Sequence, residues 1–542
     1  MRFNIKPSAT YLPLVFAIVL IVGMLIGVRL VDTSGEGSMF VYPKSDKLSG
    51  VLSFIEMEYV DSISKDNLVE KTIPSLLKSL DPHSMYIPAS DLQRVTEPLE
   101  GNFDGIGIQF NMLNDTIVVI QTISGGPSEK IGIMPGDRIV SIEDSIVAGV
   151  GMDDQEVVQS LRGQRGSKVN VGVKRQNIDG LIDFEITRDR IPLYSVDVSY
   201  MIDNEIGYIK ISQFSRTTFK EYMEAAEKLN SQGMKKLILD LRGNGGGYMD
   251  ASTNIADQFL EGGKLIVYTE GQSKPRSNVY ATTKGINLDT ELLILIDEWS
   301  ASASEIIAGA IQDNDRGKVV GRRSFGKGLV QTQTMFSDGS ALRLTVARYY
   351  TPTGRSIQKP YDEGSENYYN DLDERFRHGE FDIADSIKFN DSLKFITPGG
   401  NIVYGGGGIM PDVFIPRDTT GMTDFYSQVT RRGLVYRFAF DYADKNRNSL
   451  SGFRSAAEIN RYLDRQSLMD NFLTFAEGEG LTGNDDQIAM SRDIMHTQIK
   501  AYIARNVLDN EGFYPIISRI DDALQRSVLL LKGEPAKIAS EK

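Results

Sequence analysis

Residues 193 to 360 alternate short apolar strands with helical stretches, and this alternation limits the possible fold more than any other feature of the chain. The segment KKLILDLR precedes a glycine-rich loop and the helical run MDASTNIADQFL, and ELLILIDE precedes SASASEIIAGAIQDN. Strands that alternate with helices form parallel sheets covered by helices. The sequence therefore predicts an α/β core over 191–419, in which the polar stretch 361–400 is a surface insertion.

The segments outside this core differ from it in their hydrophobic periodicity. Residues 32–100 combine a linker with helical apolar spacing, which predicts a small helical region. Residues 101–190 contain short β runs separated by glycines and predict a compact β-rich module. Residues 420–542 return to helical spacing, so we expect an α/β multidomain protein with a helical C-terminal extension.

Residues 12–28 are apolar throughout, with Arg2 and Lys6 before them and Arg29 after them. With its flanks the run is long enough to cross a bilayer. No convincing small-x-small cleavage site follows, so we expect residues 1–31 to stay attached as a transmembrane signal anchor. The positive-inside rule then predicts a single-pass protein of the inner (cytoplasmic) membrane, with its body on the periplasmic, extracytoplasmic side.

Composition excludes several kinds of chemistry. A net charge of -14 does not suit a nucleic-acid-binding protein, because phosphate binding needs clustered Lys and Arg. The chain has no cysteine, which excludes disulfides, thiolate zinc sites and a cysteine nucleophile. Only His83, His378 and His496 can supply an imidazole. Residues 444–448 are similar to the start of a calcium loop, but Ser449 and Ser455 stand where that loop needs Gly and Glu, so we predict neither a metal nor a cofactor.

Three serines lie where the strand LLILI gives way to a helix: Ser300, Ser302 and Ser304. Open α/β sheets bind their ligands at this edge, so one of the three can be a nucleophile. Ser302 and Glu305 also match the S-x-x-E capping box, in which the serine hydroxyl accepts a backbone N–H. Both interpretations stay open from the residues alone.

An activated serine needs a base, and the scarcity of histidine points to a lysine or a carboxylate. Lys327 lies in the otherwise apolar stretch GRRSFGKGLVQ. Burial among Phe325, Leu329 and Val330 would lower the pKa of this lysine and favour the neutral amine. Gln331, four residues on, shares its face and can orient the amine.

The loop RGNGGG at 242–247 follows the strand LILDL and exposes backbone amides. A glycine N–H there and the N–H of Ala303 suit a developing oxyanion, although a tight turn explains the glycines equally well. Residues 321–327 match the spacing of a Walker A loop. Gly328 replaces the Ser or Thr of that motif and a strand follows instead of a helix, so we reject a nucleotide site.

At these residues the chain resembles the C-terminal processing, or tail-specific, serine peptidases that carry a PDZ domain. The matching motifs are LDPHSMY at 80–86, DLRGNGGG at 240–247, SASASEI at 300–306, GRRSFGKGLVQ at 321–331, RYYTPTGRSIQ at 348–358 and GGIMPDV at 407–413. The resemblance implies a crotonase-like α/β core, with Ser302 as nucleophile, Lys327 as general base and Gln331 holding the lysine. It also implies that Gly243, or its neighbours, and Ala303 form the oxyanion hole.

The resemblance makes residues 101–190 a PDZ domain, whose consecutive amides would bind a peptide carboxylate beside an edge strand. The residues expected to form this pocket are Gly105, Ile106, Gly107 and Ile108. The expected partners are C-terminal segments of exported or unfolded proteins. Arg162, at the end of the PDZ helix, either couples ligand binding to domain position or is a solvated charge.

The sequence thus predicts an exported serine endopeptidase that recognises protein C-termini through its PDZ domain and cleaves by a Ser-Lys acyl-enzyme mechanism. One alternative is a non-catalytic periplasmic PDZ adaptor that uses the α/β core as a scaffold. Another is an endopeptidase that is indifferent to C-termini. The substrate and the oligomeric state do not follow from the sequence.

Overall fold

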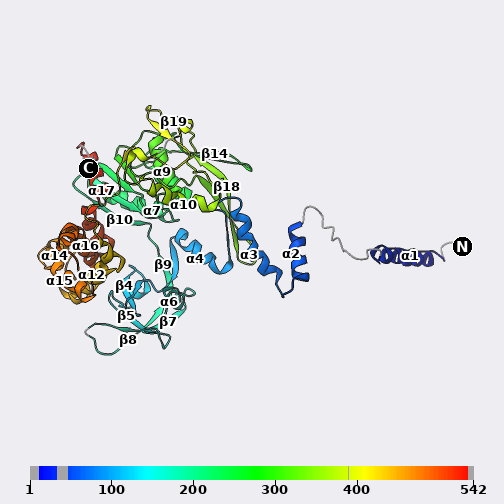
Figure 1. Cartoon of the computed structure of the whole chain (residues 1–542), viewed down its shortest axis with the longest axis horizontal. Coiled ribbons are helices and arrows are strands. Elements are labelled where there is room, and N and C mark those ends of the chain that lie inside the picture. The colour runs from blue at the N-terminus through cyan, green and yellow to red at the C-terminus, as the bar shows by residue number, and fades with distance from the viewer. Residues whose placement is uncertain (1–10, 33–46, 177, 388–389, 535–542) are drawn as a thin grey trace, which may run out of the picture. The chain divides into compact units, whose positions relative to one another are not determined.

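The protein is described by a computed structural model that covers residues 11–32, 47–176, 178–387 and 390–534 (Figure 1). It divides into two units, Met1–Leu76 and Leu77–Lys542. Residues 33–46, most of the expected linker, lie outside the described residues. The helices at the N-terminal end of the chain are α1 (Leu12–Asp32), α2 (Lys47–Glu58) and α3 (Lys65–Lys78). No helix in the described ranges combines the length and the hydropathy of a membrane span.

The β-rich module forms as predicted before the α/β core. Its sheet has the strand order β3-β4-β5-β7-β8, and β6 pairs with β5. Valines 169, 171 and 173 alternate into its core along β7, because successive strand residues point to opposite faces. The elements of this module are β2 (Asn102–Gly105), β3 (Ile108–Met112), β4 (Ile117–Thr122), α5 (Pro127–Lys130), β5 (Arg138–Ile142), β6 (Ser145–Ile146), α6 (Asp154–Leu161), β7 (Lys168–Lys174), β8 (Ile182–Thr187) and β9 (Asp189–Pro192).

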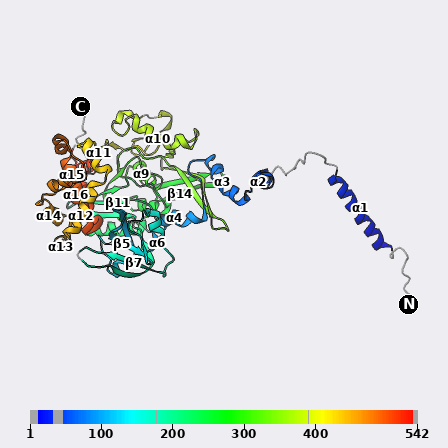
Figure 2. The same cartoon turned by 60° about the horizontal axis from the view of Figure 1, so that its bottom comes forward.

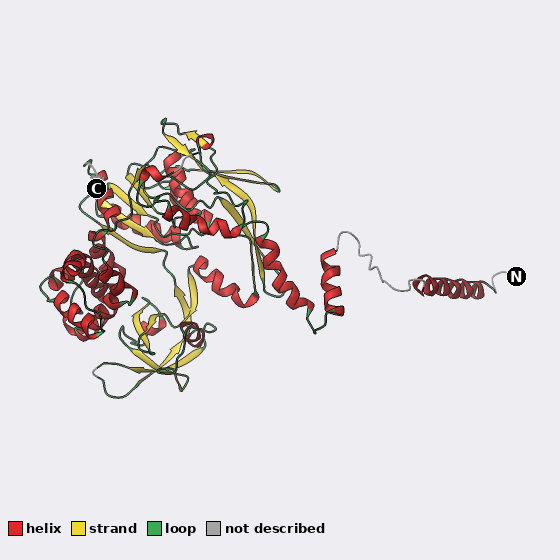
Figure 3. Cartoon of the chain, viewed as in Figure 1, coloured by secondary structure: helices red, strands yellow, loops and turns green. Residues whose placement is uncertain are grey.

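The core contains the predicted alternation of strands and helices (Figure 3). Its main sheet has the order β10-β11-β12-β15-β16-β21, which is parallel except for the edge strand β10. The strands are β10 (Val196–Met201), β11 (Ile206–Ile211), β12 (Lys236–Asp240), β15 (Glu291–Ile296), β16 (Lys318–Gly321) and β21 (Val413–Phe414). The mixed α/β prediction is confirmed.

Both faces of this sheet are buried. Leu237 and Leu239 of β12 pack under α7 (Thr218–Ser231), α8 (Met249–Asp257) and α9 (Ala303–Asp313). Ile238, between them in sequence, points to the other face and packs with α17 (Asp522–Leu531). Central parallel strands read as continuous apolar runs because helices cover both of their sides.

A second sheet has five strands and includes β1 and β17. Strand β18 pairs with β1, β13 and β17, and β13 pairs with β14. The strands are β1 (Met85–Ile87), β13 (Leu265–Gly271), β14 (Lys274–Tyr280), β17 (Leu329–Met335) and β18 (Ala341–Tyr350). The helix α4 (Ala89–Glu100) follows β1.

The stretch expected to be a surface insertion is partly buried. It folds into α10 (Ser365–Arg377), two short 3-10 helices and the hairpin of β19 (Lys394–Ile396) and β20 (Ile402–Tyr404), with residues 388–389 outside the described part. Tyr368 is 2% exposed, and Arg375 donates to the carbonyls of Arg323 and Ser324. The sequence of α10 has little apolar periodicity, because its buried contacts include ion pairs. For this reason the sequence predicted an exposed, irregular segment.

The helical C-terminal prediction is also confirmed. Helices α11 to α16 share one apolar core and gather together in both Figure 1 and Figure 2. They are α11 (Asp424–Arg431), α12 (Leu434–Lys445), α13 (Arg447–Leu450), α14 (Ala456–Leu463), α15 (Leu468–Gly478) and α16 (Asp485–Ile517), which is kinked at Leu508 and Asp509. The last helix, α17, is not part of this bundle, since it packs on the sheet of the α/β core.

Candidate active site

Ser302 lies between the end of β15 and the start of α9, at the carboxyl edge of the parallel sheet. Its backbone has φ +55° and ψ −109°, in the region that serine rarely adopts. Such a conformation costs about 1–3 kcal/mol and persists where the surroundings enforce it. The strain therefore marks Ser302 as a residue held in place for a purpose other than helix capping alone.

The tertiary structure separates Ser302 from the two neighbouring serines. Ser300 is buried and donates to the carbonyl of Leu241 at 2.8 Å. Ser304 is buried and donates to the carbonyl of Asn244 at 2.9 Å. Ser302 instead lines a cleft of about 990 Å³. Of the three hydroxyl groups, the one at Ser302 is placed to meet a ligand.

Lys327 lines the same cleft as Ser302. Burial lowers the pKa of its ammonium group, and the positive charge of Arg343 lowers it further. The ammonium Nζ donates to Gln331 Oε1 at 3.1 Å. The structure thus brings Ser302, Lys327 and Gln331 to one cleft, with the lysine shifted toward its neutral form as the sequence predicted.

Gln331 is itself held by the segment LDPHSMY at 80–86, whose role the sequence did not indicate. Its side-chain amide donates to the carbonyl of His83 at 2.5 Å, which directs Oε1 toward the lysine. The imidazole Nε2 of His83 lies 2.8 Å from the hydroxyl of Tyr368, and Asp81 accepts from the His83 N–H at 2.8 Å. Burial and the nearby Lys327 lower the pKa of His83 to about 4, so this imidazole is neutral at physiological pH.

Glu305 connects the serine turn to the lysine segment. Its fully buried carboxylate accepts from the N–H of Ser302 at 2.8 Å and from the N–H of Lys327 at 2.9 Å. The N–H of Gly326 and the hydroxyl of Ser324 complete the set at 2.7 and 2.5 Å. Burial raises the pKa of Glu305 to about 7. The S-x-x-E pattern therefore contributes more than a helix cap, because one carboxylate fixes the backbone of both Ser302 and Lys327.

The glycine-rich loop lies directly against Ser302, but Gly243 does not. The N–H of Gly243 donates to Asp297 at 2.9 Å, so it is not available to an oxyanion in the cleft. Gly246 has φ +104°, and a Cβ added there would lie 2.8 Å from the Cβ of Ser302 and 3.1 Å from the nitrogen of Ala303. The cleft is lined by the glycines that follow, Gly245, Gly246 and Gly247, together with Ala303.

Both apolar and charged side chains line the cleft. Met249, Ile306 and Leu329 are among the apolar ones, and Arg216 and Arg343 are among the charged ones. Across the described ranges, no group of three or more His, Asp or Glu side chains is arranged to hold a metal ion.

The four residues expected to bind a peptide carboxylate span the connection from the end of β2, Gly105, to the start of β3, Ile108. Ile106 is buried and its carbonyl accepts from Ser128, both from the N–H at 3.1 Å and from the hydroxyl at 2.6 Å. Gly107 has φ +75°, which a side chain disfavours. Among the described strands β3 pairs only with β4, so its other edge has no strand partner.

Arg162 is not a free surface charge. Its guanidinium is ion-paired with Glu97 of α4 and lies 4.7 Å from the centre of the Phe103 ring. The end of the module's helix is therefore tied to the segment that leads from α4 into β2. Of the two interpretations of Arg162, the solvated charge does not describe this structure.

A mostly parallel α/β core with a cleft lined by a strained serine and a half-buried lysine, preceded by a β-rich module, fits a serine-type peptidase with a PDZ domain. The matches to protein families agree with this class. Residues 205–364 match peptidase family S41 and residues 105–186 match the PDZ domain. Residues 425–509 match a family of unknown function, DUF8443.

Two relatives more than 30% identical to the chain carry the assignment further. The chain is 36% identical to the carboxy-terminal processing protease CtpA of Bacillus subtilis (strain 168) over 317 residues, which are 58% of this chain and 67% of the relative. It is 34% identical to the carboxy-terminal-processing protease of Bartonella bacilliformis over 340 residues, which are 62% of this chain and 77% of the relative. The solved photosystem II D1 C-terminal processing protease matches with 26% identity and a TM-score of 0.37, over 72% of this chain and 92% of that one. The protein belongs to the carboxy-terminal processing proteases of family S41.

Proposed function

We propose that Ser302 is the nucleophile of this peptidase and Lys327 its general base. The observation that carries the proposal is a half-buried lysine with a lowered pKa in the same cleft as a serine on a strained turn. Neutral Lys327 Nζ takes the proton of Ser302 Oγ while Oγ bonds to the peptide carbonyl carbon. The lysine then gives this proton to the leaving amine as the C–N bond breaks. Water, deprotonated by the same amine, attacks the acyl-enzyme and releases Ser302.

The oxyanion that forms in each step needs two backbone donors. We place them at the N–H of Ala303 and at the N–H of Gly245 or Gly247, because these residues line the cleft, whereas the N–H groups of Gly243 and Gly246 donate to Asp297 and to the Asn244 side chain. Gln331 orients the amine of Lys327, and Glu305 fixes the distance between the two catalytic segments.

The substrates we propose are exported or unfolded proteins whose C-terminal segments bind the PDZ domain. The carboxylate would bind the amides of residues 105–108 and the preceding residues would add as a strand to the edge of β3 opposite to β4. The family assignment and the position of β3 at the end of its sheet support this mode of binding. The adaptor alternative has no supporting observation, since the chain belongs to a family of peptidases.

Cleavage of an unstructured peptide should depend on its free C-terminus. Amidation replaces the C-terminal carboxylate, whose charged oxygens accept hydrogen bonds from backbone amides, by a neutral amide. Each such bond is worth about 1.5–3 kcal/mol, so we expect kcat/KM to fall about 10-fold or more. The measurement is steady-state cleavage of a peptide in its free and amidated forms, with acetylation of the N-terminus as the matched control. Equal rates for the two C-termini would mean an endopeptidase that ignores C-termini.

We further propose that residues 12–28 anchor the protein in the inner membrane, with its body in the periplasm. The apolar run and its basic flanks support this, as do the exposed apolar side chains of α1, Phe16 and Leu20 among them. A charge at the centre of such a segment costs about 2.5–3.5 kcal/mol of insertion free energy. Val19→Arg should therefore move much of the protein out of the carbonate-washed membrane pellet, whereas Val19→Leu should not. Equal retention of both variants would contradict the anchor.

A further inference from the structure

The last helix of the chain, α17, completes the α/β core, although neither the peptidase match nor the DUF8443 match reaches it. Leu524, Val528 and Leu531 pack against the face of the sheet opposite to α7, α8 and α9. The end of α16 is fixed to β10, the edge strand of this sheet. Tyr514 donates to the carboxylate of Asp197 at 3.0 Å, and Asn510 donates to the backbone carbonyl of Asp197 at 3.0 Å. This segment therefore has a defined position on the peptidase core.

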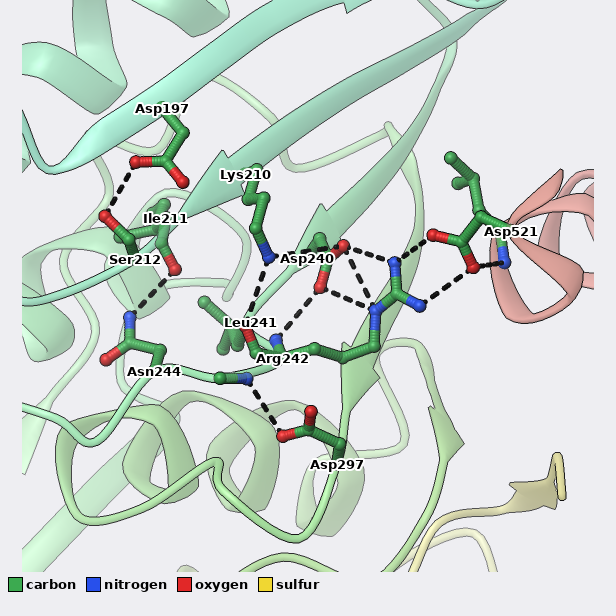
Figure 4. Close-up of polar contacts among 12 residues, drawn as sticks. Asp197, Lys210, Ile211, Ser212, Asp240, Leu241, Arg242, Asn244, Asp297 and Asp521 are labelled. Carbon is green, nitrogen blue, oxygen red and sulfur yellow. Dashed lines mark hydrogen bonds and ion pairs between the residues drawn. The ribbon is translucent and has the colours of Figure 1, made fainter. Parts of the chain in front are cut away.

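Asp521, the N-cap of α17, contacts the strand-to-loop segment that leads to the active-site cleft. Its carboxylate accepts from the N–H of Leu524 at 3.1 Å, as an N-cap does. The same carboxylate accepts two hydrogen bonds from the guanidinium of Arg242, at 2.9 and 2.7 Å (Figure 4). Paired Arg–carboxylate bonds of this kind are directional as well as strong.

Arg242 holds a central position between α17 and the glycine-rich loop. Its guanidinium also binds the fully buried Asp240, and Asp240 accepts from the N–H of Arg242 at 2.9 Å. The carbonyl of Arg242 accepts from Lys210 at 3.1 Å (Figure 4). Arg242, the residue before the loop 243–247, is thus held through its N–H, its carbonyl and its guanidinium. Asp240 binds one side of the guanidinium and Asp521 binds the other.

The loop that begins at the next residue is bonded to the chain on both sides of Ser302. The backbone carbonyl of Asn244 accepts from the N–H of Ala301 at 2.9 Å and from the hydroxyl of Ser304 at 2.9 Å. The Asn244 side chain donates to the carbonyl of Ile211 at 3.0 Å (Figure 4). Gly246 lies in contact with Ser302 and leaves no room for a Cβ. A shift of Arg242 would therefore change the distance between the loop amides and Ser302.

We propose that Asp521 is a positioning residue of the active site: it holds Arg242, and through Arg242 the loop 243–247, in register with Ser302. This proposal rests on the proposed roles of Ser302 and of the loop as nucleophile and oxyanion donor. The C-terminal helix would then be part of the catalytic unit rather than an appendage to it. A displacement of about 1 Å in a positioned group is enough to lower the rate of a reaction by orders of magnitude.

Docking of α17 does not depend on this ion pair. The helix is held by its three apolar side chains, and Lys532 at its other end binds Asp203 at 2.9 Å. Removing the Asp521 carboxylate should consequently leave the helix in place and act on the loop. A loss of activity in such a variant can therefore be assigned to the loop and not to the unfolding of the core.

The test is Asp521→Asn, because asparagine keeps the N-cap and removes the charge. Asp521→Ser serves as a second variant of the same kind. Asp522→Asn is the matched control, since Asp522 lies one residue on and pairs within its own helix with Arg526. Rates are normalised to the concentration of active sites titrated with a fluorophosphonate. Each variant is tested in the full-length enzyme, next to Ser302→Ala as background.

We expect both Asp521 variants to lower kcat about 10-fold, with KM unchanged, because the loop acts on the transition state. The affinity for a peptide aldehyde, which forms a tetrahedral adduct, should fall in parallel, and the affinity for the matching alcohol should not. Asp522→Asn should match the wild type. Unchanged kcat in both Asp521 variants, or equal losses in affinity for aldehyde and alcohol, would overturn the proposal while leaving the role of Ser302 intact. Activity of Ser302→Ala at the wild-type level would overturn both.

Discussion

Replacing Ser302 by alanine should lower kcat/KM for an unstructured protein substrate by about 10⁶-fold, the loss seen when a serine nucleophile is removed. The physical reason is that neither neighbouring serine can replace it, since Ser300 and Ser304 are buried and donate to backbone carbonyls. The measurement is cleavage of a peptide with a quenched fluorophore. Labelling by a fluorophosphonate, located by mass spectrometry, should identify Ser302 in the wild type.

Ser304→Ala is the matched control for this loss. It removes a buried hydroxyl from the same helix turn and one hydrogen bond to the loop, worth about 1 kcal/mol, so we expect less than a 10-fold effect on kcat/KM. Labelling of Ser304, or cleavage by Ser302→Ala at the wild-type rate, would show that the nucleophile has been assigned to the wrong residue.

Lys327→Met should lower kcat/KM by about 10⁴-fold, since it removes the proton acceptor for Ser302 and the proton donor for the leaving amine. Methionine fills the space of the half-buried lysine, so the loss reports on the amine. Lys359→Met is the control: Lys359 is a buried lysine whose pKa is also lowered by burial, but it pairs with Asp371 at 2.9 Å and does not line the cleft. Comparable losses in both variants would show that the effect is structural.

The dependence of kcat/KM on pH tests the protonation state of Lys327. Only the neutral amine accepts a proton, so activity should rise with pH as Lys327 deprotonates, with a midpoint below the ordinary lysine value of 10.5 because burial lowers the pKa. Gln331→Glu adds a carboxylate at the position 3.1 Å from the ammonium, which favours the charged form. This variant should move the rise to higher pH. An unmoved profile would exclude Lys327 as the titrating group.

The sequence predicted those parts of the site whose residues lie close together along the chain. Lys327 and Gln331 lie four residues apart in an apolar stretch, so their shared position and the lowered lysine pKa followed from spacing and burial. The contacts of Gln331 with His83, and of His83 with Tyr368, join segments separated by 248 and 285 residues in sequence. No periodicity encodes such contacts, and neither the turn at 80–86 nor the insertion had a predictable role.

The oxyanion loop shows the same limit on a smaller scale. Its glycines and its place after a strand were visible in the sequence, but the direction of each N–H depends on backbone torsion angles and on partners elsewhere in the fold. Asp297, which lies 54 residues away in sequence, takes the N–H of Gly243. The donors we propose consequently lie further along the loop than the residue first expected.

By itself the sequence determined the α/β alternation of the core, the PDZ domain before it, the helical region after it and the short stretch that holds the lysine and its glutamine. These follow from hydrophobic periodicity and from motifs within a dozen residues. Only the tertiary structure showed which of the three serines faces the cleft, and it revealed the contacts of Glu305, His83 and Asp521 on which their proposed roles rest. The reason is that burial, and the partner that each hydroxyl or amide finds, are properties of segments brought together by folding.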